Sequence, residues 1–303
     1  MEEYIGKVKL NYNFYSGNDF YSDGDIENEL LETVKEKKNY ENIISETDKF
    51  ALFYHLSDIR KFICEPMDID KSDLILEIGS GCGAITGRLA DMGKSVECVE
   101  LSKRRSMINA YRNAEKDNIE IIVGNYENVR LAKKYNIITL IGVFEYANSY
   151  FHSETPYEDF LLDVWKKLAD GGKLYIAIEN RLGAKYFAGC GEDHAGKISE
   201  GLEGYPDFKM AKTFSYYEWL DLLKKCGINN YKFYYPYPDY KFPRIIYSDN
   251  YLPSKNDSFE RASNYSSKRR VFFDEAKFYK SLVLEEEFKI FSNSFLIELR
   301  KQA

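Results

Sequence analysis

The chain has 303 residues, of which 44% are hydrophobic and 30% charged, and its net charge at pH 7 is −7. This length accommodates one large domain, or one domain with a cap. The acidic balance argues against nucleic acid or an anionic membrane as the main partner, so we predict that no nucleic acid is bound. The five cysteines are scattered without a C-x-x-C pair, which excludes a disulfide framework.

Residues 1–70 are expected to form helices that cap the domain that follows. The first ten, MEEYIGKVKL, are charged and contain no apolar signal segment, which predicts a cytoplasmic location. No apolar run approaches the roughly 20 residues that span a bilayer, so no membrane span is expected. An acidic stretch leads into a helix from about Glu27, and apolar residues recur at helical spacing over 47–64.

From residue 74 onward, short apolar segments alternate with helical ones. This alternation predicts a parallel sheet with right-handed crossovers, into which the last strand inserts antiparallel. Residues 71–303 are then one domain, with insertions at about 180–212 and 237–285 that are predicted to form a substrate lid. The seven expected strands cover residues 74–79, 95–100, 119–124, 135–144, 173–179, 230–238 and 292–300.

A glycine-rich loop follows the first of these strands. Residues 79–84 read GSGCGA, which satisfies G-x-G-x-G and comes within one position of the dinucleotide pattern G-x-G-x-x-G/A. Both patterns require an acidic residue at the end of the second strand, where its carboxylate accepts hydrogen bonds from ribose hydroxyls. Glu100 stands there, 21 positions after Gly79. The loop alone therefore leaves two nucleotide cofactors open.

Three further features favour S-adenosylmethionine over a nicotinamide dinucleotide. Glu77 precedes the first glycine by two positions, where an acidic side chain suits the aminoacyl end of the cofactor and not a pyrophosphate. Asn125 and Tyr126 follow the third strand and offer an amide and a flat ring to an adenine. The chain also shows a single nucleotide-binding half. An oxidoreductase, and a non-catalytic domain that binds a glycan or a protein, remain alternatives.

These residues resemble the core of class I S-adenosylmethionine-dependent methyltransferases. The resemblance implies a Rossmann-like, seven-stranded, mostly parallel sheet with helices on both faces, and release of S-adenosylhomocysteine. The segment Ile141–Tyr146 is similar to the part of the family that passes the cofactor and faces the substrate, although Tyr146 stands where the family often has His. The expected cofactor-binding residues are Glu77, Gly79, Ser80, Gly81, Gly83, Glu100, Leu101, Asn125, Tyr126, Gly142, Tyr54 and Arg60.

A narrower resemblance extends over nearly the whole chain. YHLSDIR, LEIGSGCGAIT, IENRLGAKYFAG, EDHAG, FYYPYPDYK and SNSFL are similar to segments of bacterial methyltransferases found beside glycosyltransferases in surface-polysaccharide gene sets. This implies polysaccharide biosynthesis, O-methylation of a sugar or glycan-linked group, and association with glycosyltransferases. A carboxylate, phosphate or amine of a small metabolite or peptide is the alternative acceptor.

Residues after the fourth and fifth strands are candidates for catalysis and acceptor binding. His194 follows two carboxylates and is the predicted base, with Glu145 and Tyr146 as further catalytic residues. Arg60, beside Tyr54, is predicted to pair with the cofactor carboxylate. No metal site is predicted, because Cys190 and His194 alone are too few ligands. Tyrosines after residue 230 are candidates for stacking on a sugar, and the predicted acceptor-binding residues are Glu179, Asn180, Arg181, Lys185 and Tyr186.

Overall fold

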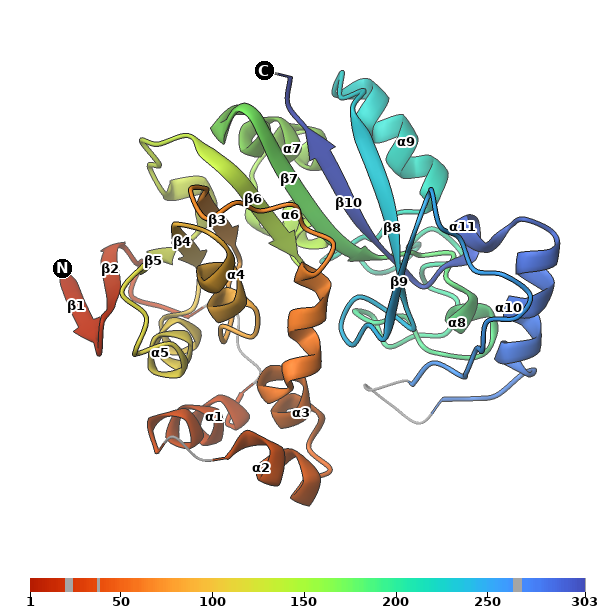
Figure 1. Ribbon diagram of the computed structural model, residues 1–303, viewed down its shortest axis with the longest axis horizontal. Helices are drawn as coiled ribbons and strands as arrows, with labels where there is room; N and C mark the ends of the chain where they lie inside the picture. Colours follow the sequence, from red (N-terminus) through yellow and green to blue (C-terminus); the bar gives the residue numbers. More distant parts are fainter. Residues whose placement is uncertain (20–23, 37–38, 264–268, 303) are drawn as a thin grey trace. The chain divides into compact units, whose positions relative to one another are not determined.

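The computed structural model describes residues 1–19, 24–36, 39–263 and 269–302 (Figure 1). The chain divides into two compact units. Unit 1 comprises residues 1–140, 167–174 and 301–303, and unit 2 comprises residues 141–166 and 175–300. Among the described residues, no helix is both long enough and apolar enough to cross a membrane.

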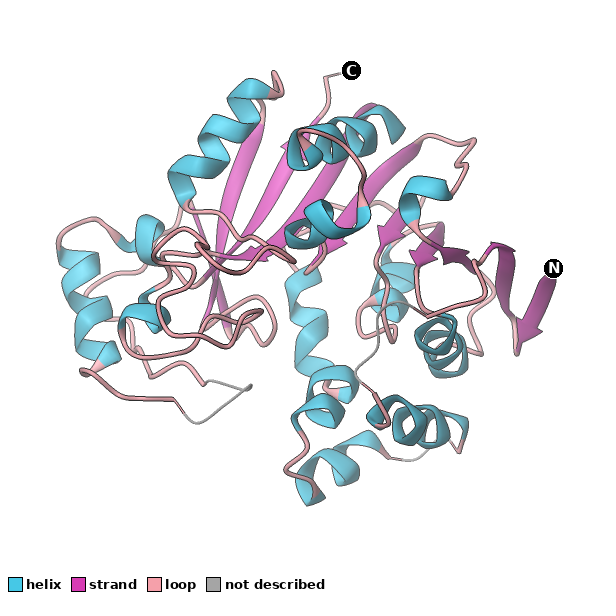
Figure 2. Cartoon of the chain, turned by 180° about the vertical axis from the view of Figure 1, so that it is seen from behind, coloured by secondary structure: helices cyan, strands magenta, loops and turns pink. Residues whose placement is uncertain are grey.

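The strands join in the order β1-β2-β5-β4-β3-β6-β7-β10-β8-β9, and helices flank them (Figure 2). From β2 to β6 in this order each strand is parallel to its neighbour. The parallel pairing of β5, β4, β3 and β6 was predicted, and that of β2 was not. The described sheet has ten strands, whereas the sequence predicted seven. The three strands that were not expected are β1, β2 and β9. The bounds are β1 Glu2–Ile5, β2 Val8–Phe14, β3 Leu74–Ile78, β4 Ser95–Glu100, β5 Ile119–Gly124, β6 Tyr135–Ile141, β7 Leu168–Glu179, β8 Tyr231–Tyr237, β9 Ile245–Ser248 and β10 Ser294–Arg300.

The N-terminal residues depart from the prediction that residues 1–70 form helices only. β1 and β2 make an antiparallel hairpin, and β2 continues the sheet by pairing parallel with β5. The physical reason is a period of two: Val8 and Leu10 are fully buried, whereas Lys9 between them is partly exposed. Helical residues do follow, in α1 Ile26–Lys35, α2 Tyr40–Glu46, α3 Phe50–Leu56 and the 3₁₀ helix η1 Asp58–Cys64.

The remaining helices of unit 1 cover the parallel strands. In α5, Ser102 caps the first turn by accepting a hydrogen bond from the Arg105 amide. The inner faces of α1, α3 and α5 share a core that includes Leu30, Leu52 and Ile108. The bounds are α4 Thr86–Met92, α5 Lys103–Arg112 and the 3₁₀ helix η2 Tyr126–Asn128.

Unit 2 contains the antiparallel end of the sheet. β10 pairs antiparallel with β8, which confirms that a late strand inserts against its neighbours. α9 begins with the predicted capping box, in which Ser215 and Glu218 bond to each other's backbone amides. The helical bounds are η3 Phe144–Tyr146, α6 Ala147–Tyr150, α7 Pro156–Lys167, α8 Ala184–Phe187, α9 Tyr216–Lys225, α10 Glu275–Leu284 and α11 Phe288–Phe291.

The tyrosines of β8 and the following turn are mostly part of the core of unit 2. Tyr235 is fully buried and donates to Asp249, and Tyr237 donates to the Glu260 carbonyl. Tyr231 is 40% exposed, whereas Tyr240 is 2% exposed. The expected sugar-stacking surface is therefore not formed by this set, because the apolar rings gain more from burial against each other.

Candidate active site

The glycine loop between β3 and α4 depends on backbone conformations that favour glycine. Gly79, Gly81 and Gly83 have φ angles of +72°, +52° and +74°. A Cβ on Gly83 would lie 2.3 Å from the Asn109 side-chain oxygen, so a larger residue there would push the loop away from α5. The Gly79 amide bonds to the Val99 carbonyl at 2.8 Å. The three glycines therefore give this loop the backbone conformations that its pattern predicts.

Glu100 fixes this loop. One of its oxygens accepts from the Gly81 amide at 2.7 Å, and the other accepts from the Ser102 amide at 2.9 Å. The side chain is buried, and that burial raises the pKa of Glu100 even though Arg105 and both amides oppose the rise. Each oxygen retains a lone pair, which is what ribose hydroxyls require.

Asp19 is a residue that the sequence did not reveal as part of this region. Its carboxylate accepts from the Lys103 amide at 2.7 Å, the Arg104 amide at 3.2 Å and the Ser102 hydroxyl at 3.1 Å. It thus occupies the N-terminus of α5, where the helix dipole favours an anion. No local pattern links Asp19 to a helix more than eighty residues away.

Glu77 lies under the loop at the end of β3. Its carboxylate accepts from the Thr86 hydroxyl at 2.7 Å and contacts the Cys98 thiol at 3.5 Å. Burial raises the pKa of Glu77 to about 7, because few groups replace the water it has lost. A positively charged ligand group beside it would restore the ionised form.

Other predicted cofactor residues of unit 1 lie near the ends of the same strands. Asn125 stands at the start of η2, directly after β5, and Tyr126 is buried. The Arg60 guanidinium lies 3.8 Å from the centre of the Tyr54 ring. Arg60 is buried, and among the described residues its Nε has no hydrogen-bond partner, so it can receive a carboxylate. Ser80 is buried and Leu101 is partly exposed.

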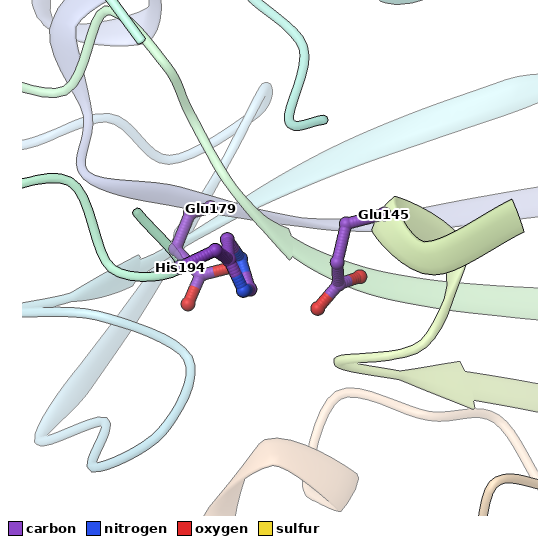
Figure 3. A group of neighbouring side chains, drawn as sticks. All are labelled: Glu145, Glu179 and His194. Atoms are coloured by element: carbon purple, nitrogen blue, oxygen red, sulfur yellow. The ribbon is translucent and has the colours of Figure 1, made fainter. Parts of the chain in front are cut away.

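Unit 2 brings together three predicted residues, Glu145, Glu179 and His194, from separate segments (Figure 3). One ligating atom from each lies within 4.8 Å of the other two. His194 Nε2 is 3.6 Å from Glu179 Oε2, and its Nδ1 is 3.1 Å from the Tyr146 hydroxyl. The arrangement follows from topology: Glu179 ends β7, and Glu145 is in the turn after β6.

The electrostatics of this cluster come from burial and mutual charge. Burial, reinforced by the charge of Glu179, raises the pKa of Glu145. Burial opposes the ionised form of Glu179, but Lys241 and His194 outweigh it and hold the pKa of Glu179 below its usual range. Burial also opposes a charged His194, yet Glu179 raises the pKa of that ring to about 9. His194 therefore carries its proton at neutral pH and must lose it before it can act as the predicted base.

Two lysines and an aspartate adjoin the cluster. Lys241 ion-pairs with Glu179 and lies 2.7 Å from Asp193, and Lys185 lies 2.7 Å from the other Asp193 oxygen. Tyr186 donates to Asp193 at 2.5 Å. Lys185 and Tyr186 thus contact Asp193, which precedes the candidate base, and their predicted role in binding the acceptor stays a prediction. Lys241 was not predicted, since nothing in its local sequence separates it from a surface lysine.

Asn180 and Arg181 have structural partners. The Asn180 amide donates to the carbonyls of Ile290 and Ser292. Arg181 pairs with Glu218 at 2.5 Å and donates to the Gly201 carbonyl. Their predicted contact with the acceptor stays a prediction. Gly142, the predicted cofactor residue of unit 2, has a φ of +69°, and a Cβ there would lie 2.7 Å from the Tyr240 hydroxyl.

Comparison with known proteins identifies relatives for part of the chain. The family model for ribosomal RNA adenine dimethylase matches residues 53–157, about a third of the chain. A ribosomal RNA small subunit methyltransferase A from Fusobacterium nucleatum is 27% identical over 180 residues, which cover 59% of this chain and 62% of that protein. The mitochondrial ubiquinone biosynthesis O-methyltransferase of Schizosaccharomyces pombe is 28% identical over 114 residues, covering 35% and 38%. The chain thus spans less than two thirds of either relative.

These relatives contradict one prediction. The exclusion of nucleic acid as a partner is wrong, because the family model and the Fusobacterium protein are both named for ribosomal RNA. That exclusion came from the net charge of the whole chain, which does not describe the charge of any one surface.

A solved structure supports the fold across more of the chain. Phosphoethanolamine N-methyltransferase 1 of Haemonchus contortus, in complex with phosphoethanolamine and S-adenosylhomocysteine, superposes with a TM-score of 0.51 at 12% identity, covering 90% of this chain and 49% of that one. The family model and both relatives are methyltransferases, and this similarity supports the predicted enzyme class and the predicted cofactor, S-adenosylmethionine. The fold is that of a class I S-adenosylmethionine-dependent methyltransferase.

Proposed function

We propose that the chain transfers the methyl group of S-adenosylmethionine to a hydroxyl of a sugar or a glycan-linked group. The observation that carries the choice of a hydroxyl is the buried cluster of Glu145, Glu179 and His194, in which Glu145 Oε2, Glu179 Oε2 and His194 Nε2 have no hydrogen-bond partner among the described residues. A hydroxyl is a hydrogen-bond donor and suits carboxylate oxygens in such a place. Buried polar groups of this kind are costly unless a ligand satisfies them.

The chemistry of the reaction agrees with this acceptor. The hydroxyl oxygen attacks the methyl carbon in line, the carbon–sulfur bond breaks, and S-adenosylhomocysteine leaves. The hydroxyl must give up its proton during this step, and a positioned acid–base cluster speeds such a transfer by about 10²–10⁴-fold. The ionised Glu179 supplies the negative charge that favours removal of the proton. A carboxylate or phosphate acceptor is already deprotonated, so its methylation would not require an acid–base cluster.

A second candidate is methylation of a base in RNA, as the names of the family model and of the Fusobacterium relative suggest. The specific observation in its favour is the match over residues 53–157, which includes the glycine loop, Glu100 and Glu145. The matched segment ends before Glu179, His194 and Lys241. We therefore rank RNA methylation second, because most of the cluster lies outside the segment that matches the family model.

The experiment tests saccharides and ribosomal RNA as acceptors with the same enzyme. The chain is incubated with methyl-labelled S-adenosylmethionine and either a panel of mono- and oligosaccharides or unmodified ribosomal RNA, and products are identified by mass spectrometry. We expect an acid-stable methyl ether on a saccharide. Label confined to a methylated adenine of the RNA would overturn the proposal in favour of the second candidate. Association with glycosyltransferases, a role in polysaccharide biosynthesis and a cytoplasmic location remain part of this proposal.

A further inference from the structure

The cluster in unit 2 places three metal-ligand side chains around one point. Glu145, Glu179 and His194 direct two carboxylates and one imidazole toward a common region (Figure 3). The 3.6 Å between His194 Nε2 and Glu179 Oε2 is close to the roughly 3.4 Å expected between ligands of a tetrahedral ion with bonds of about 2.1 Å. The sequence alone predicted no metal site, because these residues are widely spaced along the chain.

The ligand atoms are buried and lack hydrogen-bond partners. Glu145 is 1% exposed, Glu179 is fully buried, and the His194 side chain is 9% exposed. Among the described residues, Glu145 Oε2, Glu179 Oε2 and His194 Nε2 have no hydrogen-bond partner. Lys241 pairs with the other Glu179 oxygen, and Oε2 faces His194 Nε2 at 3.6 Å. Carboxylate oxygens in such a position are stabilised by a cation.

Neighbouring groups hold the three ligands in place. The Tyr146 hydroxyl lies 3.1 Å from His194 Nδ1, which leaves Nε2 as the ligating atom. Glu192 accepts from the backbone amides of His194 and Ala195 at 2.8 and 2.6 Å, which fixes the loop that carries the ring. The Glu145 carbonyl accepts from the Lys212 amide at 2.9 Å. Such supporting contacts are usual around metal ligands.

The charge of the region also favours a cation. Five carboxylates gather here and are buried or nearly so: Glu145, Glu179, Glu192, Asp193 and Asp239. Two lysines, Lys185 and Lys241, oppose them. The carboxylates outnumber the lysines in this set, and a divalent cation would take the place of the proton that His194 carries.

We propose that Glu145, Glu179 and His194 bind one divalent transition-metal cation of the Mn²⁺, Co²⁺ or Zn²⁺ class. Two oxygens and one imidazole nitrogen suit these ions, and three protein ligands leave positions open for a further ligand. The role of the site in turnover rests on the proposed function: a hydroxyl bound at an open position would lose its proton more readily. In the metal-bound enzyme His194 holds the cation and is not itself the base.

The test measures metal binding directly, without cofactor or acceptor, so that its result does not depend on the proposed function. The metal-free chain is titrated with Co²⁺ while visible absorption is followed, and with Mn²⁺ by calorimetry. We expect one cation per chain and d–d absorption bands that disappear on addition of a chelator. Glu179→Gln and His194→Asn should weaken binding at least tenfold, and His194→Asn should also shift the bands.

His152→Asn is the matched control, since His152 is exposed and lies outside the cluster. It should bind as the unchanged chain does. No binding by the unchanged chain, or equal binding by all three variants, would overturn the proposal. Circular dichroism establishes that each variant is folded. Should a variant unfold, the stoichiometry and the cobalt spectrum of the unchanged chain still decide the question.

Discussion

At the residue scale, the structure gives Glu100 a second role beside the predicted one. Its oxygens are expected to bind ribose, and the structure adds that they hold the Gly81 amide and the start of α5. Its position at the end of β4 was predictable, because strand ends in this fold meet the ligand. Its contact with the Gly81 amide could not be predicted, because that contact depends on how the glycine loop folds back over the end of β4.

Glu100→Ala should therefore weaken the binding of S-adenosylhomocysteine by tenfold or more, or about 1.4 kcal/mol and upward, through loss of both roles. Calorimetry measures the affinity. Glu120→Ala, in the next strand and on the surface with Lys9, is the control and should change affinity little. Equal affinity of the Glu100 variant and the unchanged chain would show that this carboxylate does not serve the cofactor.

The pKa of Glu77 predicts how cofactor affinity depends on pH. Burial raises this pKa to about 7, so the free enzyme holds a neutral carboxyl below that pH. The cofactor ammonium prefers the ionised form, and affinity should rise as pH increases through about 7 and then level off. Glu77→Gln should remove the rise, whereas Glu97→Gln, in β4, should keep it. A falling affinity over this range, or the same rise in the Glu77 variant, would contradict the assignment.

At the element scale, the sequence predicts the parallel strands and their helices but misses the N-terminal hairpin. The strands from β3 to β6 are short, largely apolar segments between clear helix signals, and such segments can be recognised in a sequence. β7 begins five residues before the predicted strand, because the glycine-containing segment 168–172 extends it. β2 is more polar, and only the alternation of Val8 and Leu10 indicates it. Its partner β5 lies more than a hundred residues away, so local sequence could not establish the pairing.

Leu10→Ala should lower the free energy of unfolding by about 2–5 kcal/mol, because the fully buried side chain would leave a cavity. Urea denaturation followed by circular dichroism measures the loss. Lys9→Ala, on the other face of the same strand, should cost about 1 kcal/mol or less. Similar losses for the two variants would mean that β2 is not packed into the sheet.

At the scale of the whole molecule, the candidate cofactor residues can be found from a local sequence pattern more readily than the residues proposed to act on the acceptor. The cofactor residues follow a contiguous pattern, and the family similarity covers it. The polar cluster joins positions 145, 179, 194 and 241, and their proximity depends on the tertiary fold of unit 2. The net charge led to the wrong prediction about nucleic acid for a related reason, because it sums charges over the whole chain and does not describe any single surface.

The separation of Glu77 and Glu100 from the His194 cluster along the fold predicts that binding and turnover can be changed independently. His194→Asn, in unit 2, should reduce the turnover number by about 10²-fold or more and leave the affinity for S-adenosylhomocysteine within about twofold. His152→Asn should retain turnover. Formation of S-adenosylhomocysteine with the acceptor found above measures turnover. A wild-type rate for the His194 variant would remove this residue from the reaction.

The central claim is that the glycine loop with Glu77 and Glu100 holds S-adenosylmethionine. Calorimetric titration of the purified chain with S-adenosylhomocysteine, and separately with a nicotinamide dinucleotide, tests it most directly. The account predicts one S-adenosylhomocysteine per chain and no binding of the dinucleotide. Binding of the dinucleotide without binding of S-adenosylhomocysteine would contradict it.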